Sequence, residues 1–232
     1  MPKPPLSVPD ILNQLESFYG PQQPGWPTDP YLFVVWWLCG YPASDKACAK
    51  GWESLNHEIG VDPGQLLSVA PADLARALKP GGMVPELRAM RLKEIAARVK
   101  DEFAGDLGSA LTGPLADARG KLKKFPNIAD PGADRILLFA GIAPLAAVPS
   151  NCPHVLVRIL YGKERENYGV TYREAQEAIA AEVTDTFDAR TRAYLLLKRH
   201  GQETCKTKPK CEKCPVSRMC AYFSGKKRGA SA

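Results

Sequence analysis

Long hydrophobic runs are absent from this 232-residue sequence, whose longest apolar stretch, from Tyr31 to Cys39, is far below the ~20 residues that a membrane-spanning helix needs. The first ten residues, MPKPPLSVPD, have no apolar run behind their basic residue, so no secretory signal is expected. Strand-like alternation of apolar and polar residues, internal repeats and low-complexity segments are also missing. These absences leave an all-α globular protein of one large domain or two small ones as the expectation.

Four of the seven cysteines are concentrated near the C-terminus in the order C-x5-C-x2-C-x5-C. Structural zinc sites usually combine two short knuckles separated by a longer stretch, whereas this segment has a single C-x2-C knuckle. Short loops around one helical turn can bring four thiolates to an iron–sulfur cluster, so a [4Fe-4S] centre is the favoured interpretation. Zinc and four unlinked structural thiols are the alternatives. The four candidate metal ligands are Cys205, Cys211, Cys214 and Cys220.

The other cysteines, Cys39, Cys48 and Cys152, lie among apolar or small residues and are expected to be reduced thiols, mostly in the core. A disulfide framework is not expected once four cysteines are assigned to metal. A reducing, cytoplasmic location fits both expectations.

The formal net charge of +6 and the pI near 8.9 favour a polyanionic partner, although a solvated basic face is the alternative. Lysines cluster in three places: at 121–124, around the cysteines at 206–213, and at the end of the chain. Lys208 and Lys210 lie between the first two cysteines, where their ammonium groups could reach a phosphate.

Helical periodicity and helix-start residues predict most of the elements. Asp29 and Pro30 open a helix through Leu38 that is apolar all round and therefore buried. A first helix should bury Ile11, Leu12, Leu15 and Phe18, and a long helix at 85–103 should turn Leu87, Met90, Ile95 and Val99 inward. Further helices are expected at about 115–125, 154–160, 171–183 and 187–200.

The segment from Leu122 to Ile136, LKKFPNIADPGADRI, is typical of a helix, a tight turn and a second helix whose free N–H groups can hold a phosphate. Here, and in HGQETCKTKPKCEKCP at 200–215, the chain resembles the helix-hairpin-helix DNA glycosylases of the endonuclease III type. The match runs from about Phe33 to Tyr222. The resemblance implies a monomeric protein that binds double-stranded, damaged DNA and extrudes a nucleotide into a pocket.

The resemblance also implies two helical domains flanking a DNA groove. Residues 29–163 would form a six-helix barrel with the helix-hairpin-helix at about 115–141. Residues 1–28 and 164–232 would form a discontinuous iron–sulfur cluster domain.

Both usual catalytic side chains are replaced. The family's lysine, an amine that forms a Schiff base with the sugar, corresponds to Pro131, and its aspartate corresponds to Pro149. Lysine-type lyase chemistry is therefore excluded, and no catalytic residue can be assigned. A water held by Ser150, Asn151 or His154 is one replacement, although a lone histidine is more often a structural hydrogen-bonding group.

The resemblance gives DNA-binding roles to the hairpin residues and to a tyrosine in the position of the family's wedge residue, Tyr41, for which a core or rim position is the alternative. Asn127 and Ala129 replace two glycines of the hairpin; asparagine tolerates the left-handed conformation, and alanine does so at ~1 kcal/mol. The hairpin residues assigned to DNA are Asn127, Ile128, Ala129 and Gly132.

Three functions remain open at this stage. The first is an iron–sulfur glycosylase-like repair protein that releases a base by unconventional groups, and the second is a non-catalytic protein of the same fold that binds DNA structure or damage. The third, an electron-carrying or cluster-sensing protein, is disfavoured by the hairpin and the basic loop.

Overall fold

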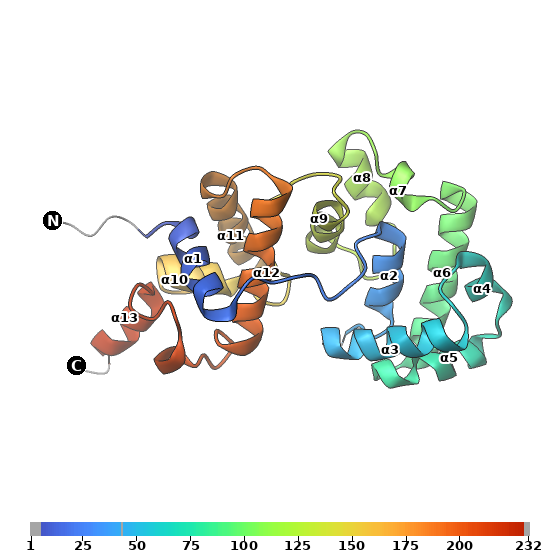
Figure 1. Cartoon of the computed structure of the whole chain (residues 1–232), viewed down its shortest axis with the longest axis horizontal. Coiled ribbons are helices and arrows are strands. Elements are labelled where there is room, and N and C mark those ends of the chain that lie inside the picture. The colour runs from blue at the N-terminus through green and yellow to red at the C-terminus, as the bar shows by residue number, and fades with distance from the viewer. Residues whose placement is uncertain (1–5, 43, 230–232) are drawn as a thin grey trace. The chain divides into compact units, whose positions relative to one another are not determined.

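The structure is a computed structural model that describes residues 6–42 and 44–229. Every regular element in these residues is a helix, as the sequence predicted (Figure 1). In this part of the chain no helix has both the length and the apolar content that a membrane span requires. The helices are α1 (Val8–Tyr19), α2 (Pro30–Leu38), α3 (Asp45–Glu58), α4 (Pro63–Ser68), α5 (Pro71–Leu78), η1 (Lys79–Gly81), α6 (Pro85–Phe103), α7 (Leu107–Ala110), α8 (Leu115–Leu122), α9 (Asp130–Phe139), α10 (His154–Tyr161), α11 (Tyr168–Glu182), α12 (Phe187–Glu203), η2 (Cys211–Lys213) and α13 (Ala221–Gly229).

The chain forms two compact units. A continuous unit spans Pro24–Ile142 and contains α2 to α9. A discontinuous unit joins α1 to α10–α13, and its described residues are 6–23 and 143–229. Each unit has its own buried apolar residues, as expected of a domain.

The division lies at different positions from the boundaries predicted at 28 and 163. Helix α10 contacts α11, α12 and α13, and its residues Val155, Leu156 and Ile159 belong to the core of the discontinuous unit. At the other boundary, Trp26 packs on Trp36 and Phe139 of the continuous unit. The contacts of these buried side chains assign α10 to the discontinuous unit and the segment around Trp26 to the continuous unit. The linear pattern of the sequence does not specify such contacts.

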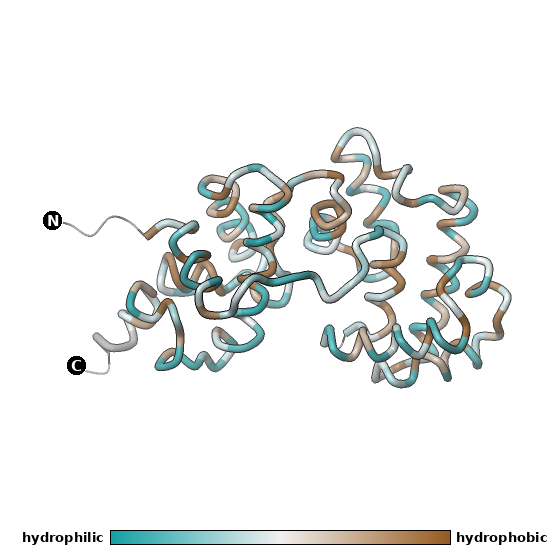
Figure 2. Tube along the Cα trace, viewed as in Figure 1, coloured by the Kyte–Doolittle hydropathy of each residue, from teal (hydrophilic) through white to brown (hydrophobic). Residues whose placement is uncertain are grey.

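Helix α2 is a buried helix of the continuous unit, as predicted from its sequence of apolar and aromatic residues, and it is partly brown and nowhere strongly teal in Figure 2. The Asp29 carboxylate caps it by accepting a hydrogen bond from the main-chain N–H of Leu32 at 2.9 Å. Because α2 contacts α3, α6, α7 and α9, apolar residues are required on every side of it. Seven of its residues are buried.

Arg135 connects α9 to this core. Its guanidinium carbon lies 3.9 Å from the ring centroid of Trp26 and 4.7 Å from that of Phe33. A desolvated contact of this kind contributes about 2 kcal/mol. The preceding residue, Asp134, accepts a hydrogen bond from Arg119 of α8 at 2.6 Å, so α9 is held by charged side chains on two sides.

The buried face of α6 differs from the prediction. Ile95 and Val99 are buried as expected, but Leu87 and Met90 are 41% and 64% exposed. The face that packs inward begins instead at Arg88, whose guanidinium donates hydrogen bonds to the carbonyls of Cys39, Leu78 and Gly82. Because Arg88 donates hydrogen bonds to buried carbonyls, its face of α6 packs inward and the face with Leu87 and Met90 is exposed. Apolar periodicity alone could not indicate this.

Helix α1 follows the prediction except at its end. Ser7 caps it, and Ile11, Leu12 and Leu15 are buried, whereas Phe18 is 58% exposed. The last turn presents Tyr19 to the interior instead, where its hydroxyl meets His200 of α12.

Candidate functional site: a four-cysteine pocket and a hairpin turn

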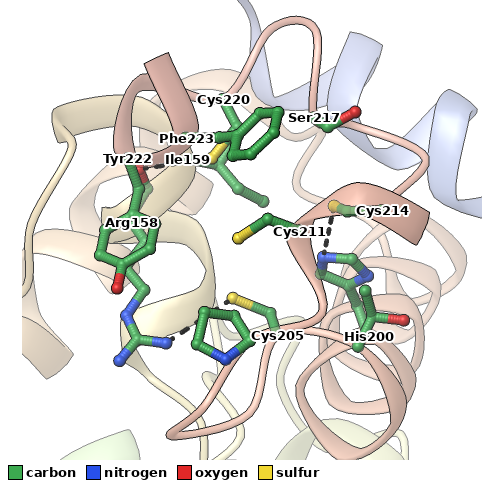
Figure 3. A pocket seen from close by; sticks show the side chains of 12 residues that line it. Arg158, Ile159, His200, Cys205, Cys211, Cys214, Ser217, Cys220, Tyr222 and Phe223 are labelled. Atoms are coloured by element: carbon green, nitrogen blue, oxygen red, sulfur yellow. Dashed lines mark hydrogen bonds between the residues drawn. The ribbon is translucent and has the colours of Figure 1, made fainter. Parts of the chain in front are cut away.

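The four C-terminal cysteines lie around one pocket of the discontinuous unit (Figure 3). Cys205 follows α12, Cys211 and Cys214 are at either end of the single turn η2, and Cys220 precedes α13. The main-chain N–H of Lys210 donates to the carbonyl of Thr204 at 3.0 Å and closes the first loop. The space between the cysteines is about 320 Å³, counting the part that is open to solvent.

The donor set of this pocket consists of four cysteines, which can serve as ligands in zinc sites and in iron–sulfur clusters. All four cysteines are free thiols. Among the described residues, no group of three or more His, Cys, Asp or Glu side chains is arranged closely enough to hold a single metal ion. In a cubic iron–sulfur cluster irons alternate with sulfides at the corners and each thiolate binds a different iron, so the four thiolates would lie around a larger space than at a single ion. Ile159 and Phe223 supply apolar lining to the same pocket.

Burial favours the neutral thiol form of three of these cysteines. It raises the pKa of the Cys214 thiol to about 11, and it raises the pKa of Cys205 and of Cys220 as well. A metal centre binds thiolates, so its assembly in this pocket must release protons.

Two side chains that sequence reasoning missed contact the cysteine sulfurs. The buried Arg158 of α10 donates to the Cys205 Sγ at 3.9 Å, and also to the carbonyl of Lys206 at 2.8 Å. His200 of α12, which is 0% exposed, places Nε2 3.7 Å from the Cys214 Sγ. Burial lowers the pKa of His200 to about 4, so its ring is neutral at physiological pH. The motif around His200 was noticed in the sequence, but only the fold brings Arg158 to the pocket.

The basic residues of the cysteine loop are exposed. None of them forms an ion pair with a carboxylate within the described part of the chain, which leaves their ammonium groups available to an anionic partner. Those residues are Lys206, Lys208, Lys210 and Lys213.

The lysines that precede the hairpin are engaged within the protein. Lys121 donates to the carbonyl of Ala110 at 2.5 Å, and Lys124 lies 3.5 Å from a carboxylate oxygen of Glu102. The positive charge that is free to attract a polyanion is therefore greater at the cysteine loop than at the hairpin.

The predicted helix-hairpin-helix consists of α8, a turn at residues 123–129 and α9. Asn127 adopts the left-handed conformation, with φ of 63°, as its replacement of a glycine suggested. Ala129 does not: its φ is −106° and its backbone is extended, so the expected strain at this residue is absent. The N-cap position of α9 requires an extended residue there.

Only some of the hairpin residues that were predicted to bind DNA have a main-chain N–H group that can donate a hydrogen bond to an anion. Ile128 is buried and its N–H donates to the carbonyl of Phe125 at 3.2 Å, so it is not available. No side chain caps α9, and helix geometry leaves the N–H groups of Ala129 and Gly132 without an intrahelical acceptor. Asp130, in the first turn, pairs with Lys123 at 2.8 Å.

The two prolines that the resemblance placed at the family's catalytic positions have different surroundings. Pro131 lies in the first turn of α9, where its missing N–H costs no helical hydrogen bond. Pro149 is buried in the loop before α10. Beside it, Ser150 and Asn151 are exposed.

His154 is occupied by a structural hydrogen bond. Its Nε2 lies 2.8 Å from the carbonyl oxygen of Cys205, and burial lowers its pKa. It thus connects the start of α10 to the cysteine loop. Tyr41, the predicted wedge, is half-buried at the end of α2, with its ring centroid 5.1 Å from that of Trp37.

Comparisons with known proteins agree on the architecture. No protein-family model and no curated protein sequence matches the chain. A solved structure of a trapped endonuclease III–DNA covalent intermediate matches with a TM-score of 0.74 and 16% identity, covering 96% of this chain and 100% of that one. A thermostable thymine-DNA glycosylase matches with a TM-score of 0.73 and 19% identity over 94% and 97% of the two chains.

A third solved structure, the H. pylori 3-methyladenine DNA glycosylase MagIII bound to 1,N6-ethenoadenine, has a TM-score of 0.64 and 17% identity, and covers 85% of this chain and 98% of its own. The similarity extends along nearly the whole chain and includes both units. The chain therefore has the fold of endonuclease III and of these related DNA glycosylases.

Proposed function

We propose that this protein is an iron–sulfur DNA-repair protein that binds duplex DNA as a monomer, extrudes a damaged base and releases it as a monofunctional N-glycosylase. The observation that carries the proposal is the convergence of four cysteines on one pocket in a chain with the glycosylase fold, beside a loop whose exposed lysines form no ion pair among the described residues. Its location would be the reducing, DNA-containing compartment of the cell.

The cofactor would be a [4Fe-4S] cluster bound by Cys205, Cys211, Cys214 and Cys220. When bound, it would crosslink the segments from 205 to 220 and so give the lysine-bearing loop a defined shape. The protein's own contribution is to exclude water with apolar side chains and to supply donors to the sulfurs.

Each unit would contact the phosphate backbone of duplex DNA. The cysteine loop offers Lys208 and Lys210, and the hairpin offers the main-chain N–H groups of Ala129 and Gly132. These contacts carry no base sequence information, so they suit a protein that searches DNA for damage.

The absence of the family's usual catalytic lysine and aspartate limits which damaged bases the protein could release. An alkylated purine has a weakened glycosidic bond, which extrusion and desolvation can break with little further help. The similarity to a 3-methyladenine glycosylase favours the same substrate class. No amine at Pro131 means that no Schiff base forms there and no strand is cut by that route.

A non-catalytic protein that binds DNA structure or damage is the second candidate. The replacement of both catalytic side chains by Pro131 and Pro149 favours it, as does the engagement of His154 on the carbonyl of Cys205.

The test is a single-turnover base-release assay on duplexes containing 3-methyladenine, 1,N6-ethenoadenine, an abasic site or no damage. The expected result is base release that yields a nick only after hot alkali. Tight binding of one damaged duplex without release would select the second candidate. Equal weak binding to every duplex, with no release, would contradict both.

The cofactor is tested by iron and sulfide content and by visible absorption. Cys214→Ala should lose the cluster and reduce duplex affinity together. The matched control is Cys152→Ala, since Cys152 is a buried cysteine outside the pocket. Unchanged affinity in a cluster-free Cys214→Ala protein would contradict the structural role given to the loop.

A further inference from the structure

Four side chains of the discontinuous unit form a continuous chain of polar contacts: Thr204, Tyr19, His200 and Cys214. The Tyr19 hydroxyl lies 2.7 Å from the Thr204 hydroxyl and 2.9 Å from Nδ1 of His200. The other ring nitrogen, Nε2, lies 3.7 Å from the Cys214 Sγ (Figure 3). His200 and Thr204 are buried and Tyr19 is half-buried, so water competes little for these contacts.

The direction of these hydrogen bonds depends on whether Cys214 is a thiol or a metal-bound thiolate. A thiol can donate its proton to Nε2, but a thiolate bound to metal has no proton and can only accept. Nε2 must then carry the ring proton. A neutral imidazole has one N–H, so Nδ1 becomes an acceptor and takes a hydrogen bond from the Tyr19 hydroxyl. That hydroxyl oxygen in turn accepts from Thr204.

We propose that Thr204 and Tyr19 hold His200 in the tautomer that donates from Nε2 to the Cys214 sulfur, and that this hydrogen bond raises the reduction potential of the bound cluster. The inference rests on the proposed iron–sulfur centre. A hydrogen bond to a ligating sulfur stabilises the more negatively charged, reduced state of a cluster more than the oxidised state. Tyr19 and Thr204 act through His200 and are positioning residues.

Of the two residues that hold the tautomer, Tyr19 is distant in sequence and Thr204 is close. Tyr19 belongs to α1, 181 residues before His200, and reaches the ring only because α1 packs on α12. Thr204 follows α12 directly, next to the ligand Cys205. The N-terminal helix therefore takes part in the cluster site although it supplies no ligand.

The experiment measures the midpoint potential of the cluster in the full-length protein by film voltammetry, with the Fe–S(Cys) stretching frequencies from resonance Raman spectra as a second readout. The variants are Tyr19→Phe, which removes only the hydroxyl, and His200→Leu, which removes the donor. The matched control is Tyr161→Phe, because Tyr161 is an exposed tyrosine of the same unit.

The expected order of potentials is wild type and Tyr161→Phe highest, Tyr19→Phe lower and His200→Leu lowest, at equal iron content. Raman bands of the variants should shift to higher frequency as the sulfur loses its hydrogen bond. Potentials of Tyr19→Phe and His200→Leu equal to that of the control would overturn the inference. If His200→Leu does not retain iron, an unshifted potential in Tyr19→Phe is sufficient to overturn it.

The two proposals fail in different ways. Wild-type protein without iron and sulfide, even after reconstitution, contradicts the cofactor and this inference together. A cluster of normal content whose potential does not respond to Tyr19→Phe contradicts only the hydrogen-bond chain.

Discussion

The guanidinium of Arg91 donates a hydrogen bond to the side-chain oxygen of Asn127 at 3.1 Å. Arg91 belongs to α6 and Asn127 to the turn before α9, so the contact connects two helices of the continuous unit at the hairpin. Asn127 therefore has two roles: its backbone is left-handed, with φ of 63°, and its side chain anchors the turn.

Replacement of Asn127 should separate these roles. Asn127→Gly keeps the left-handed backbone and should retain duplex affinity within a few-fold, whereas Asn127→Ala adds about 1 kcal/mol of strain and should lower stability further. Thermal unfolding and duplex binding measure the two effects. Arg91→Met is the matched variant, because it removes the same hydrogen bond and leaves the turn unchanged. A large affinity loss in Asn127→Gly but not in Arg91→Met would show that the amide itself contacts DNA.

Asp130 should weaken DNA binding in the wild-type protein. Its carboxylate lies in the first turn of α9, where a phosphate would otherwise meet the helix N-terminus, and it also engages Lys123 at 2.8 Å. Asp130→Asn removes the repulsion and releases the lysine, so duplex affinity at low salt should rise several-fold. Asp101→Asn, which neutralises an exposed carboxylate of α6, is the control for net charge. Equal gains in both variants would mean that only the overall charge changed.

The cysteine loop should account for much of the salt dependence of binding. Lys208→Ala and Lys210→Ala should each reduce the slope of log affinity against log salt by about 1, because each removes one phosphate contact. The reduction should be similar for damaged and undamaged duplexes. Lys163→Ala removes an exposed lysine elsewhere in the discontinuous unit and should leave the slope unchanged. An effect of Lys163→Ala as large as that of the loop variants would refute a specific role for the loop.

Borohydride should trap no covalent complex between the wild-type protein and abasic-site DNA, since the residue in the first turn of α9 is Pro131. Pro131→Lys introduces an amine at this position and should create a trapped species, detected as a band of reduced mobility on a denaturing gel. The first turn of a helix tolerates proline but does not require it, so Pro131→Lys should reduce the stability of the protein only a little. The control is Pro131→Gln, which has a long side chain without an amine. A trapped complex in the wild-type protein would show that another amine reaches the sugar.

Glu16 and Arg192 should stabilise the discontinuous unit in a pH-dependent way. A hydrogen bond from Arg192, with Nη2 at 2.9 Å, lowers the pKa of Glu16 below its ordinary value of 4.5. The stabilisation is therefore present above pH 4.5 and is lost as the pH falls through the lowered pKa. Since both side chains are partly exposed, it amounts to at most about 1 kcal/mol.

Glu16→Gln should accordingly lower the melting temperature at pH 7, and the difference from wild type should shrink towards pH 4. Glu177→Gln, in α11 of the same unit, controls for loss of a carboxylate. A difference that stays constant or grows towards low pH would contradict the assignment.

Local chemistry made much of the fold predictable. Asp29 caps α2, as its position before Pro30 and an apolar segment indicated. The uniformly apolar sequence of α2 indicated a buried helix. The cysteine spacing indicated one centre, because four ligands joined by short loops cannot lie far apart. In each case the interaction involves residues a few positions apart, so the sequence displays it directly.

Non-local contacts decided the rest. Arg88 determines which face of α6 is buried by satisfying carbonyls at Cys39 and Leu78, so Leu87 and Met90 are exposed. The core of the discontinuous unit takes α10, which the sequence placed in the other domain.

The same is true of the candidate site. By itself the sequence determined an all-helical chain with a hairpin and with four cysteines close together near residues 205–220. Only tertiary structure brought Arg158 and His200 to the sulfurs, Tyr19 to the His200 ring, and His154 to a carbonyl. The reason is physical: a buried polar group must find a partner wherever the fold provides one, and that partner can lie anywhere in the chain.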